Sequence, residues 1–351
     1  MVYDHPTMTT VQDPPGERMA DAAAREAPLL EVAGLSVSFG GARVVDGLAL
    51  SLRQGEILGI VGESGSGKSM TALAIMRLLP PGGMLEAAAL RLLGEDIAGA
   101  PESRLEDLRG ATMGMIFQEP MTALNPVLHG GRAGRRGGPA ASGLAARPAW
   151  ARAVETLGPG RDPRPRPPER MTIPITSVGG DAPAGDDRHG AGLPPRLLIA
   201  DEPTTALDVT IQAQILDLML DLQEEYGMGI ILISHDLGVV SAFCERVMIM
   251  YLGRVMEEAP TAELFARPLH PYTEALLASI PRIGERQRRL RAIRGSVPPI
   301  FDVPPGCRFA PRCDHARPAC DRGLPPLAEA GPGRRVACIR PWDYRFPGVA
   351  E

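Results

Sequence analysis

The chain has 351 residues, 44% of them hydrophobic, which is enough for one large domain with an appendage or for two domains. Lys and Arg total 37 against 42 Asp and Glu, and aromatic residues make up 4%, so a net charge of -5 and few stacking rings argue against nucleic acid as a partner. No apolar run has the length of a membrane span, and the polar N-terminus does not resemble a signal peptide. We therefore expect a soluble, cytosolic protein that can dock on membrane proteins.

The N-terminal part of the chain changes character near residue 28. Residues 1–28 are polar and lack apolar periodicity, which predicts a disordered tail. Residues 29–52 hold short β-branched runs broken by glycines, which favour a small antiparallel sheet.

Strands and helices then alternate along the chain. Continuous apolar runs predict buried strands, and apolar residues at every third or fourth position predict helices. The expected strands span 55–62, 113–120, 195–203 and 228–236, and the expected helices span 68–79 and 210–227. This alternation predicts a mostly parallel sheet covered on both faces.

A glycine-rich loop joins the first of these strands to the first helix. The segment "GESGSGKS", Gly62 to Ser69, fits the phosphate-binding pattern G-x-x-x-x-G-K-[ST]. Its glycines allow backbone N–H groups to surround phosphates, Lys68 would reach the β and γ phosphates, and Ser69 would bind Mg²⁺. The alternative is a glycine turn before a helix, but a strand before and a helix after favour a phosphate site. The expected nucleotide-binding residues of the loop are Gly62, Ser64, Gly65, Gly67, Lys68 and Ser69.

Two adjacent acids follow the buried strand "LLIADE". Asp201 is placed to bind Mg²⁺, and Glu202 is placed to activate an attacking water. The alternative is a pair of strand-end charges that cap the next turn. His235 ends another strand and could hydrogen-bond a γ-phosphate, although a lone histidine there is more often structural. Gln118, taken alone, would be a surface residue.

Together these motifs resemble the ATP-binding subunit of an ABC transporter. The matching pieces are the Walker A loop, the Q-loop at Gln118 in "FQEPMTALNP", Walker B "LLIADE", the D-loop "TALD" ending at Asp208, and the switch His235. The resemblance implies an α/β P-loop NTPase fold that binds ATP and Mg²⁺. It also implies that Gln118 contributes to Mg²⁺ binding and to catalysis with Glu202 and His235, that Asp208 contacts the nucleotide site, and that Phe39 stacks on adenine. Phe39 as an ordinary core aromatic is an equal alternative.

Four segments resemble the oligopeptide and dipeptide importer branch in particular: "FQEPMTALNPV", "DEPTTALDVTIQAQIL", "HPYTEALL" and "PPGCRFAPRC". This resemblance implies an ATP-binding domain over 29–265 and a C-terminal extension over 266–351, which the proline-rich composition suggests is a separate small module. It implies ATP-driven import of peptides or a related solute such as nickel. The implied partners are a second, identical or homologous ABC ATPase subunit, two membrane permease subunits and an extracellular solute-binding protein, at the cytoplasmic face of the membrane. A soluble ABC ATPase of DNA repair or translation is disfavoured by the single Walker loop and by the extension.

Four of the five cysteines lie in this extension, with the spacing C-x5-C-x6-C-x17-C. This is not the C-x2-C signature of zinc sites, and disulfides are disfavoured in the cytosol. The resemblance implies that they bind a [4Fe–4S] cluster, with zinc as the alternative. The four residues are Cys307, Cys313, Cys320 and Cys338, whereas Cys244 stands alone and is expected in the core.

The Leu-Ser-Gly-Gly signature of the family is missing between Gln118 and Asp201. More than half of the residues from 129 to 170 are Gly, Pro or Arg, and we expect 129–195 to be disordered as written. Residues 177–195 can be written as DNA with one allowed choice of synonymous codons. When that DNA is translated in the reading frame that starts one base later, it encodes "LSGGMRQRVMIAMALACRP". We therefore hypothesise a frameshifted segment that begins near His129 and is restored by Arg196. A genuine insertion is the alternative, and it would leave a non-catalytic nucleotide-binding subunit.

Overall fold

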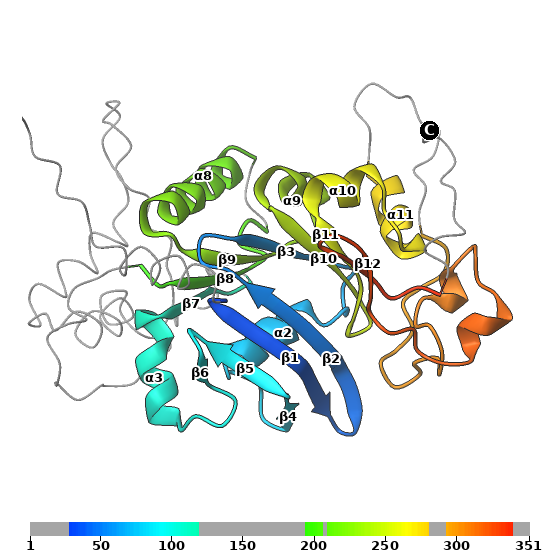
Figure 1. Cartoon of the computed structure of the whole chain (residues 1–351), viewed down its shortest axis with the longest axis horizontal. Coiled ribbons are helices and arrows are strands. Elements are labelled where there is room, and N and C mark those ends of the chain that lie inside the picture. The colour runs from blue at the N-terminus through cyan, green and yellow to red at the C-terminus, as the bar shows by residue number, and fades with distance from the viewer. Residues whose placement is uncertain (1–27, 119–193, 206–208, 281–292, 340–351) are drawn as a thin grey trace, which may run out of the picture.

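The computed structural model describes residues 28–118, 194–205, 209–280 and 293–339. The strands of these ranges form two sheets, one five-stranded and one eight-stranded (Figure 1). The expectations for the tail at 1–28 and the segment 129–195 fall, except for residues 28, 194 and 195, outside the described residues.

The smaller sheet is antiparallel throughout, as the N-terminal pattern predicts. Its strands run in the order β2-β1-β5-β6, and β4 also pairs with β1. Residues 83–96 supply three short strands that the sequence pattern did not indicate. The strands are β1 (Leu30–Phe39), β2 (Ala42–Leu52), β4 (Gly83–Glu86), β5 (Ala89–Leu92) and β6 (Glu95–Asp96).

The larger sheet has a parallel half and an antiparallel half, in the order β12-β13-β11-β10-β3-β9-β8-β7. Strands β7, β8, β9, β3 and β10 are parallel to one another, and the pairs β10–β11, β11–β13 and β13–β12 are antiparallel. The strands are β3 (Ile57–Val61), β7 (Met113–Ile116), β8 (Leu197–Asp201), β9 (Gly229–Ile233), β10 (Arg246–Tyr251), β11 (Arg254–Pro260), β12 (Ala328–Gly331) and β13 (Arg334–Val336). The alternating strands and helices thus gave the correct fold class.

Hydrophobic side chains cover both faces of the parallel half. Leu58 and Ile60 of β3 belong to one core cluster, and Ile57 and Val61 belong to another on the opposite face. The first cluster is closed by α2 (Lys68–Ile75), α3 (Glu102–Ala111) and the smaller sheet, and the second by α8 (Val209–Tyr226) and α9 (Leu237–Phe243). Because β3, β8 and β9 are fully buried, their sequences are continuous apolar runs.

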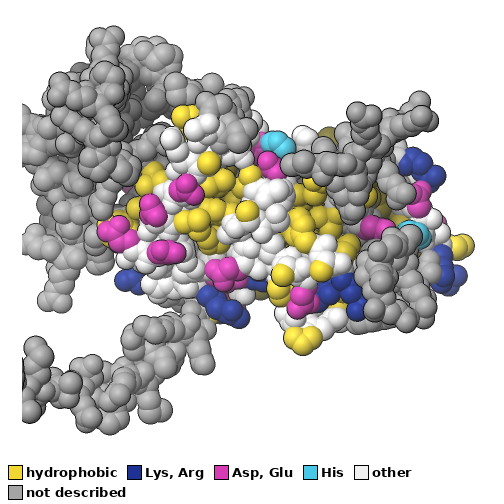
Figure 2. Space-filling model, turned by 90° about the horizontal axis from the view of Figure 1, so that it is seen from above, with side chains coloured by type: hydrophobic (Ala, Val, Ile, Leu, Met, Phe, Trp, Pro, Cys, Tyr) yellow, Lys and Arg dark blue, Asp and Glu magenta, His cyan; other side chains and the backbone are white. Residues whose placement is uncertain are grey.

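Helix α8 lies at one end of its face and presents charge to the outside. Its residues Ile215, Leu216 and Leu220 pack on the second cluster, whereas its acidic residues are exposed. Figure 2 looks onto this face, where acidic side chains gather at one end beside hydrophobic ones. No helix within the described ranges has both the length and the apolarity to cross a bilayer.

The C-terminal extension is packed as part of the core and differs from the expected separate module. Strand β13 pairs with β11 through Glu257 and Val336, and Phe309 belongs to the second core cluster. Helix α10 (Thr261–Ala266) leads into the extension, whose own helical elements are α11 (Pro271–Ala278), η1 (Ala310–Arg312) and η2 (Pro318–Asp321). Proline-rich composition does not reveal this packing, because the contacts come from a few well-spaced apolar residues.

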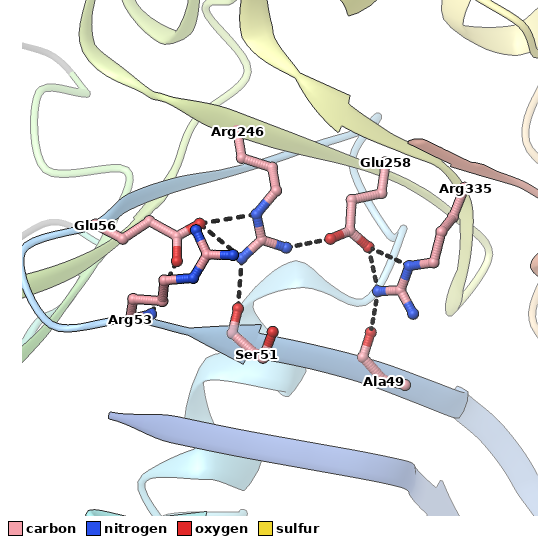
Figure 3. A network of polar contacts seen from close by, with 7 residues as sticks. All are labelled: Ala49, Ser51, Arg53, Glu56, Arg246, Glu258 and Arg335. Atoms are coloured by element: carbon pink, nitrogen blue, oxygen red, sulfur yellow. Dashed lines mark hydrogen bonds and ion pairs between the residues drawn. The ribbon is translucent and has the colours of Figure 1, made fainter. Parts of the chain in front are cut away.

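A network of buried charges joins both sheets to the extension (Figure 3). Arg335 of β13 donates to Glu258 of β11 at 3.1 Å and to the carbonyl of Ala49 in β2 at 3.3 Å. Arg246 of β10 donates to Glu56 at 2.8 Å and also pairs with Glu258. Arg335 and Arg246 therefore link the smaller sheet, through its backbone carbonyls, to the carboxylates of the larger sheet.

Candidate functional site

The glycine-rich loop connects β3 to α2, and two of its glycines are required by their surroundings. A Cβ on Gly62 would lie 2.2 Å from the carbonyl oxygen of Met250, and one on Gly67 would lie 2.7 Å from that of Val44. Gly67 and Gly65 have φ of 96° and 78°, in the region that favours glycine. A Cβ on Gly65 would meet nothing within 4 Å, so the loop is open to its surroundings at that point.

Lys68 lies inside this loop and faces carboxylates. Its Nζ donates to the carbonyl oxygens of Gly62 at 2.7 Å and Glu63 at 3.1 Å. Burial lowers the pKa of Lys68, and the carboxylates of Glu202, Asp201 and Glu63 oppose that shift. A buried ammonium group that is held by carbonyl oxygens is well placed to exchange them for an anionic ligand.

Asp201 ends β8 and is nearly fully buried, with 3% of its surface exposed. Burial raises its pKa, and a hydrogen bond with the Ser69 side chain opposes the shift. One carboxylate oxygen, Oδ1, has no hydrogen-bond partner among the described residues. A buried, unpaired carboxylate oxygen is costly unless it binds a cation, so Asp201 and Ser69 fit a Mg²⁺ site.

Glu202 follows β8 and contacts residues that follow the neighbouring strands β7 and β9. Its Oε2 accepts a hydrogen bond from Thr205 at 3.0 Å and one from Gln118, which follows β7, at 3.4 Å. The Nδ1 of His235, which follows β9, lies 3.3 Å from its Oε1. Glu202 has φ of 49°, a left-handed conformation rarely adopted outside glycine and typical of functional sites. Because β7, β8 and β9 are parallel neighbours, their carboxyl ends bring Gln118, Glu202 and His235 to the same end of the sheet.

The positions of the other expected site residues do not test their expected roles. Phe39 ends β1 opposite Gly83, where a Cβ would lie 2.8 Å from the ring, and it is half-buried against the first core cluster. Ser64 is exposed in the loop. Asp208 lies outside the described residues. The roles expected for these three residues stay predictions.

The four cysteines of the extension, Cys307, Cys313, Cys320 and Cys338, line one pocket together with His270 and Phe309. The backbone N–H of Cys307 donates to the carbonyl of Cys320 at 2.7 Å and fixes two of these segments together. Burial raises the pKa of Cys307, and it raises that of Cys313 to about 11.

This sulfur-rich pocket has the donor type of an iron–sulfur or zinc site. As the side chains stand, however, no three His, Cys, Asp or Glu residues in the described ranges are grouped closely enough to hold an ion. Cys244 is apart from the pocket and buried, and burial raises its pKa to about 12, as expected of a core residue.

The sequence analysis missed two residues of the extension that contact the loop. The Tyr272 hydroxyl accepts a hydrogen bond from the backbone N–H of Glu63 at 3.0 Å. Arg312 donates two hydrogen bonds to the Glu63 carboxylate, at 2.6 and 3.0 Å. No local spacing signals these contacts, since more than 200 residues separate the partners.

Comparison with known proteins gives two family matches. The sequence model described as "ABC transporter" matches residues 45–158, and the one described as "Oligopeptide/dipeptide transporter, C-terminal region" matches residues 256–320. The first match ends at residue 158, before β8, and the second match begins at residue 256, after β8.

Curated relatives match over most of the chain. A Brucella melitensis protein named as a peptide import ATP-binding protein is 44% identical over 330 residues, which are 90% of this chain and 95% of the relative. The oligopeptide transport ATP-binding protein OppD of Salmonella typhimurium is 42% identical over 317 residues, 89% of this chain and 94% of the relative.

Solved structures share the fold. The ATP-binding cassette MJ0796, in a dimeric post-hydrolysis state bound to ADP and Pi, has a TM-score of 0.50 and 21% identity, covering 66% of this chain and 98% of the cassette. At this identity the similarity concerns the fold alone.

Proposed function

The chain belongs to the ABC transporter family of ATP-binding subunits, and from this membership we propose that it powers the import of peptides, or of a related solute such as nickel, through separate membrane subunits. The observation that carries the proposal is the convergence of Gln118, Glu202 and His235 beside the glycine-rich loop. Peptide specificity is supported by the match of residues 256–320 and by the names of the relatives.

In the proposed reaction, each side chain at the strand edge has a separate task. Lys68 and the N–H groups of the loop bind the β and γ phosphates of ATP. Glu202 accepts a proton from water as that water's oxygen bonds to the γ-phosphorus and the bond to ADP breaks. His235 holds Glu202 and hydrogen-bonds the γ-phosphate. Ser69, Asp201 and Gln118 would hold Mg²⁺, which supplies positive charge to the phosphate oxygens.

The remaining nucleotide contacts are proposed from the family resemblance. Gly62, Ser64, Gly65 and Gly67 surround the phosphates, Phe39 stacks on adenine, and Asp208 lies across the interface between two ATPase subunits. These roles agree with the open space at Gly65 and with the narrow room at Gly62 and Gly67.

The proposed partners follow from the same family. Two ATPase subunits, identical or homologous, close on ATP and reopen on product release, and two permease subunits carry the solute delivered by an extracellular binding protein. The chain would then act at the cytoplasmic face of the membrane.

A non-catalytic nucleotide-binding subunit is the second candidate, since no Leu-Ser-Gly-Gly segment stands between Gln118 and Asp201. The family match that stops at residue 158 agrees with disturbed sequence ahead of β8. Sequencing the gene across codons 119–196 separates a frameshift from a genuine insertion: a single reading frame that encodes residues 129–195 as they stand excludes the frameshift. A soluble ABC ATPase without a transport role is not favoured, because residues 256–320 match the transporter extension.

We further propose that Cys307, Cys313, Cys320 and Cys338 bind a [4Fe–4S] cluster, with zinc as the alternative. The support is that all four line one pocket inside the extension. Burial raises the pKa of Cys307 and Cys313, so a metal must displace protons from these two thiols on binding, which makes binding pH-dependent.

The decisive experiment reconstitutes the chain with its neighbouring transporter subunits in liposomes and measures ATP hydrolysis with and without peptide and binding protein. We expect hydrolysis that rises with peptide and accompanies peptide uptake. Nucleotide binding without turnover at this subunit's site would instead support the non-catalytic candidate. An assembled complex that hydrolyses ATP but carries neither peptide nor nickel would contradict the proposed solute.

A further inference from the structure

The first turn of the phosphate-binding loop is held from outside by the C-terminal extension. Glu63 follows Gly62, and its backbone N–H donates to the hydroxyl of Tyr272 in α11 at 3.0 Å. This N–H therefore points toward the extension. The carbonyl of the same residue accepts from Ser66 N at 3.1 Å and from Lys68 Nζ at 3.1 Å, so the Glu63 peptide also anchors the lysine.

Arg312 holds the Glu63 side chain with two hydrogen bonds. Its Nη1 donates to Oε2 at 2.6 Å, and its Nη2 donates to Oε1 at 3.0 Å. Such a forked pair fixes the carboxylate in orientation as well as in position. The bond with Glu63 raises the pKa of Arg312, so the guanidinium stays charged.

Arg312 itself has little freedom to move. Its side chain is 5% exposed, its Nε donates to the carbonyl of Arg294 at 3.0 Å, and its guanidinium carbon lies 5.7 Å from the centre of the Tyr251 ring. Glu63 is 27% exposed, so the arginine is the rigid partner and the loop is the held one. Arg312 ends η1 and directly precedes Cys313, which places this anchor at the wall of the cysteine pocket.

We propose that Arg312 is a positioning residue for the phosphate-binding loop, through which the C-terminal extension sets the affinity of the loop for nucleotide. This inference rests on the proposed phosphate site. Without the Arg312 pair, the Glu63 side chain loses its fixed orientation, and the backbone of the same residue, whose carbonyl oxygen anchors the Lys68 ammonium, is held less firmly. Nucleotide must then order the loop as it binds, and the affinity falls.

A matched control is available within the same extension. Arg335 also joins the extension to the core, through Glu258 and the Ala49 carbonyl (Figure 3), and its hydrogen bonds and ion pairs in the described ranges do not include the loop. Loss of Arg335 should lower thermal stability without changing nucleotide affinity. Any effect shared by both arginine variants is general destabilisation, and an effect confined to Arg312 is loop positioning.

The test measures the Kd of the full chain for a fluorescent ATP analogue with Mg²⁺, and the KM and kcat for ATP in the assembled complex. We expect Arg312→Gln to raise Kd and KM about tenfold, as for loss of a charge-assisted pair, with kcat changed much less. Arg312→Lys should restore part of the affinity, since it keeps the charge and loses the fork. Glu63→Gln should resemble Arg312→Gln, and the double variant should be no weaker than either, because both remove one interaction.

The outcomes separate this inference from the proposed function. A wild-type chain that binds the analogue, with an Arg312→Gln variant whose Kd is unchanged, overturns the inference alone. Equal weakening by Arg312→Gln and Arg335→Gln overturns it as well. A wild-type chain that binds no analogue overturns the proposed phosphate site and this inference with it. Should Arg312→Gln fail to fold, Glu63→Gln provides the same comparison with Arg335→Gln.

Discussion

The site formed by the glycine-rich loop and the neighbouring strand ends at Asp201, Glu202 and His235, here called the loop edge, and the cysteine pocket are built in opposite ways. At the loop edge, Glu202 meets Gln118, Thr205 and His235 at 3.0 to 3.4 Å, and one oxygen of buried Asp201 has no partner in the described ranges. In the pocket, four thiols face a common space, but no three ligands are in place for an ion. A site made of strand ends is positioned by the sheet itself, whereas a site made of loops needs its ligand to complete it.

The largest effect should come from Glu202→Gln, which keeps the shape of the side chain and removes its ability to accept a proton. We expect kcat for ATP to fall about 100- to 10,000-fold, with nucleotide affinity changed only a few-fold. Steady-state hydrolysis and equilibrium binding check this. The exposed Glu329→Gln on β12 is the control and should leave both values unchanged. A Glu202→Gln variant with a wild-type kcat would contradict the role of Glu202 as the proton acceptor.

Cys313→Ala tests the second region directly. Anaerobically purified wild-type chain should contain iron with acid-labile sulfide, or zinc, and the variant should hold less than about a tenth of it, because the thiolates are the ligands. Elemental analysis and visible absorbance measure both. Cys244→Ala removes a buried thiol apart from the pocket and should keep the metal. A wild-type chain free of iron and zinc under these conditions would sink the proposed metal site.

Gly62→Ala tests how tightly the loop edge is built. The added Cβ would lie 2.2 Å from the Met250 carbonyl oxygen, so the loop must shift, and we expect stability to fall by about 1–3 kcal/mol. Nucleotide affinity should fall with it. Chemical denaturation and nucleotide titration give the two values. Gly99→Ala, where a Cβ meets nothing within 4 Å, should change neither. A Gly62→Ala variant of unchanged stability would contradict the close approach at this position.

The last prediction concerns the pH dependence of stability that His270, in the wall of the pocket, contributes. Burial lowers its pKa from 6.5 to about 3, so the unfolded chain takes up a proton in this window and the folded chain does not. Stability is therefore fully present above pH 6.5 and is lost as the pH falls toward 3.

His270→Asn keeps a side-chain acceptor for the Tyr272 N–H at the start of α11 and removes the titration. The free energy of unfolding, measured for both chains between pH 4 and 7, should converge as the pH falls. The comparison is needed because buried Glu257, whose raised pKa acts in the opposite direction, remains in both. Parallel curves for the two chains would show that His270 does not titrate in this way.

The sequence by itself determined the fold class and the composition of the loop edge. Short continuous apolar runs bounded by turn residues favour buried strands, and a glycine-rich turn between strand and helix fixes where Lys68 and Ser69 stand. The grouping of Gln118, Glu202 and His235 was expected from the family resemblance, and the parallel pairing of β7, β8 and β9 in the structure is its physical basis. The short strands β4, β5 and β6 carry too little periodicity to be found in this way.

Only the tertiary structure decided how the extension meets the core. Pairing of β13 with β11, the Arg335–Glu258 link and the Arg312–Glu63 clamp each join segments that are far apart in the chain. Such contacts depend on which surfaces the packed sheet brings together, and no local pattern of charge or apolarity encodes them. The sequence therefore specifies the phosphate-binding loop, and packing adds the residues that hold it from outside.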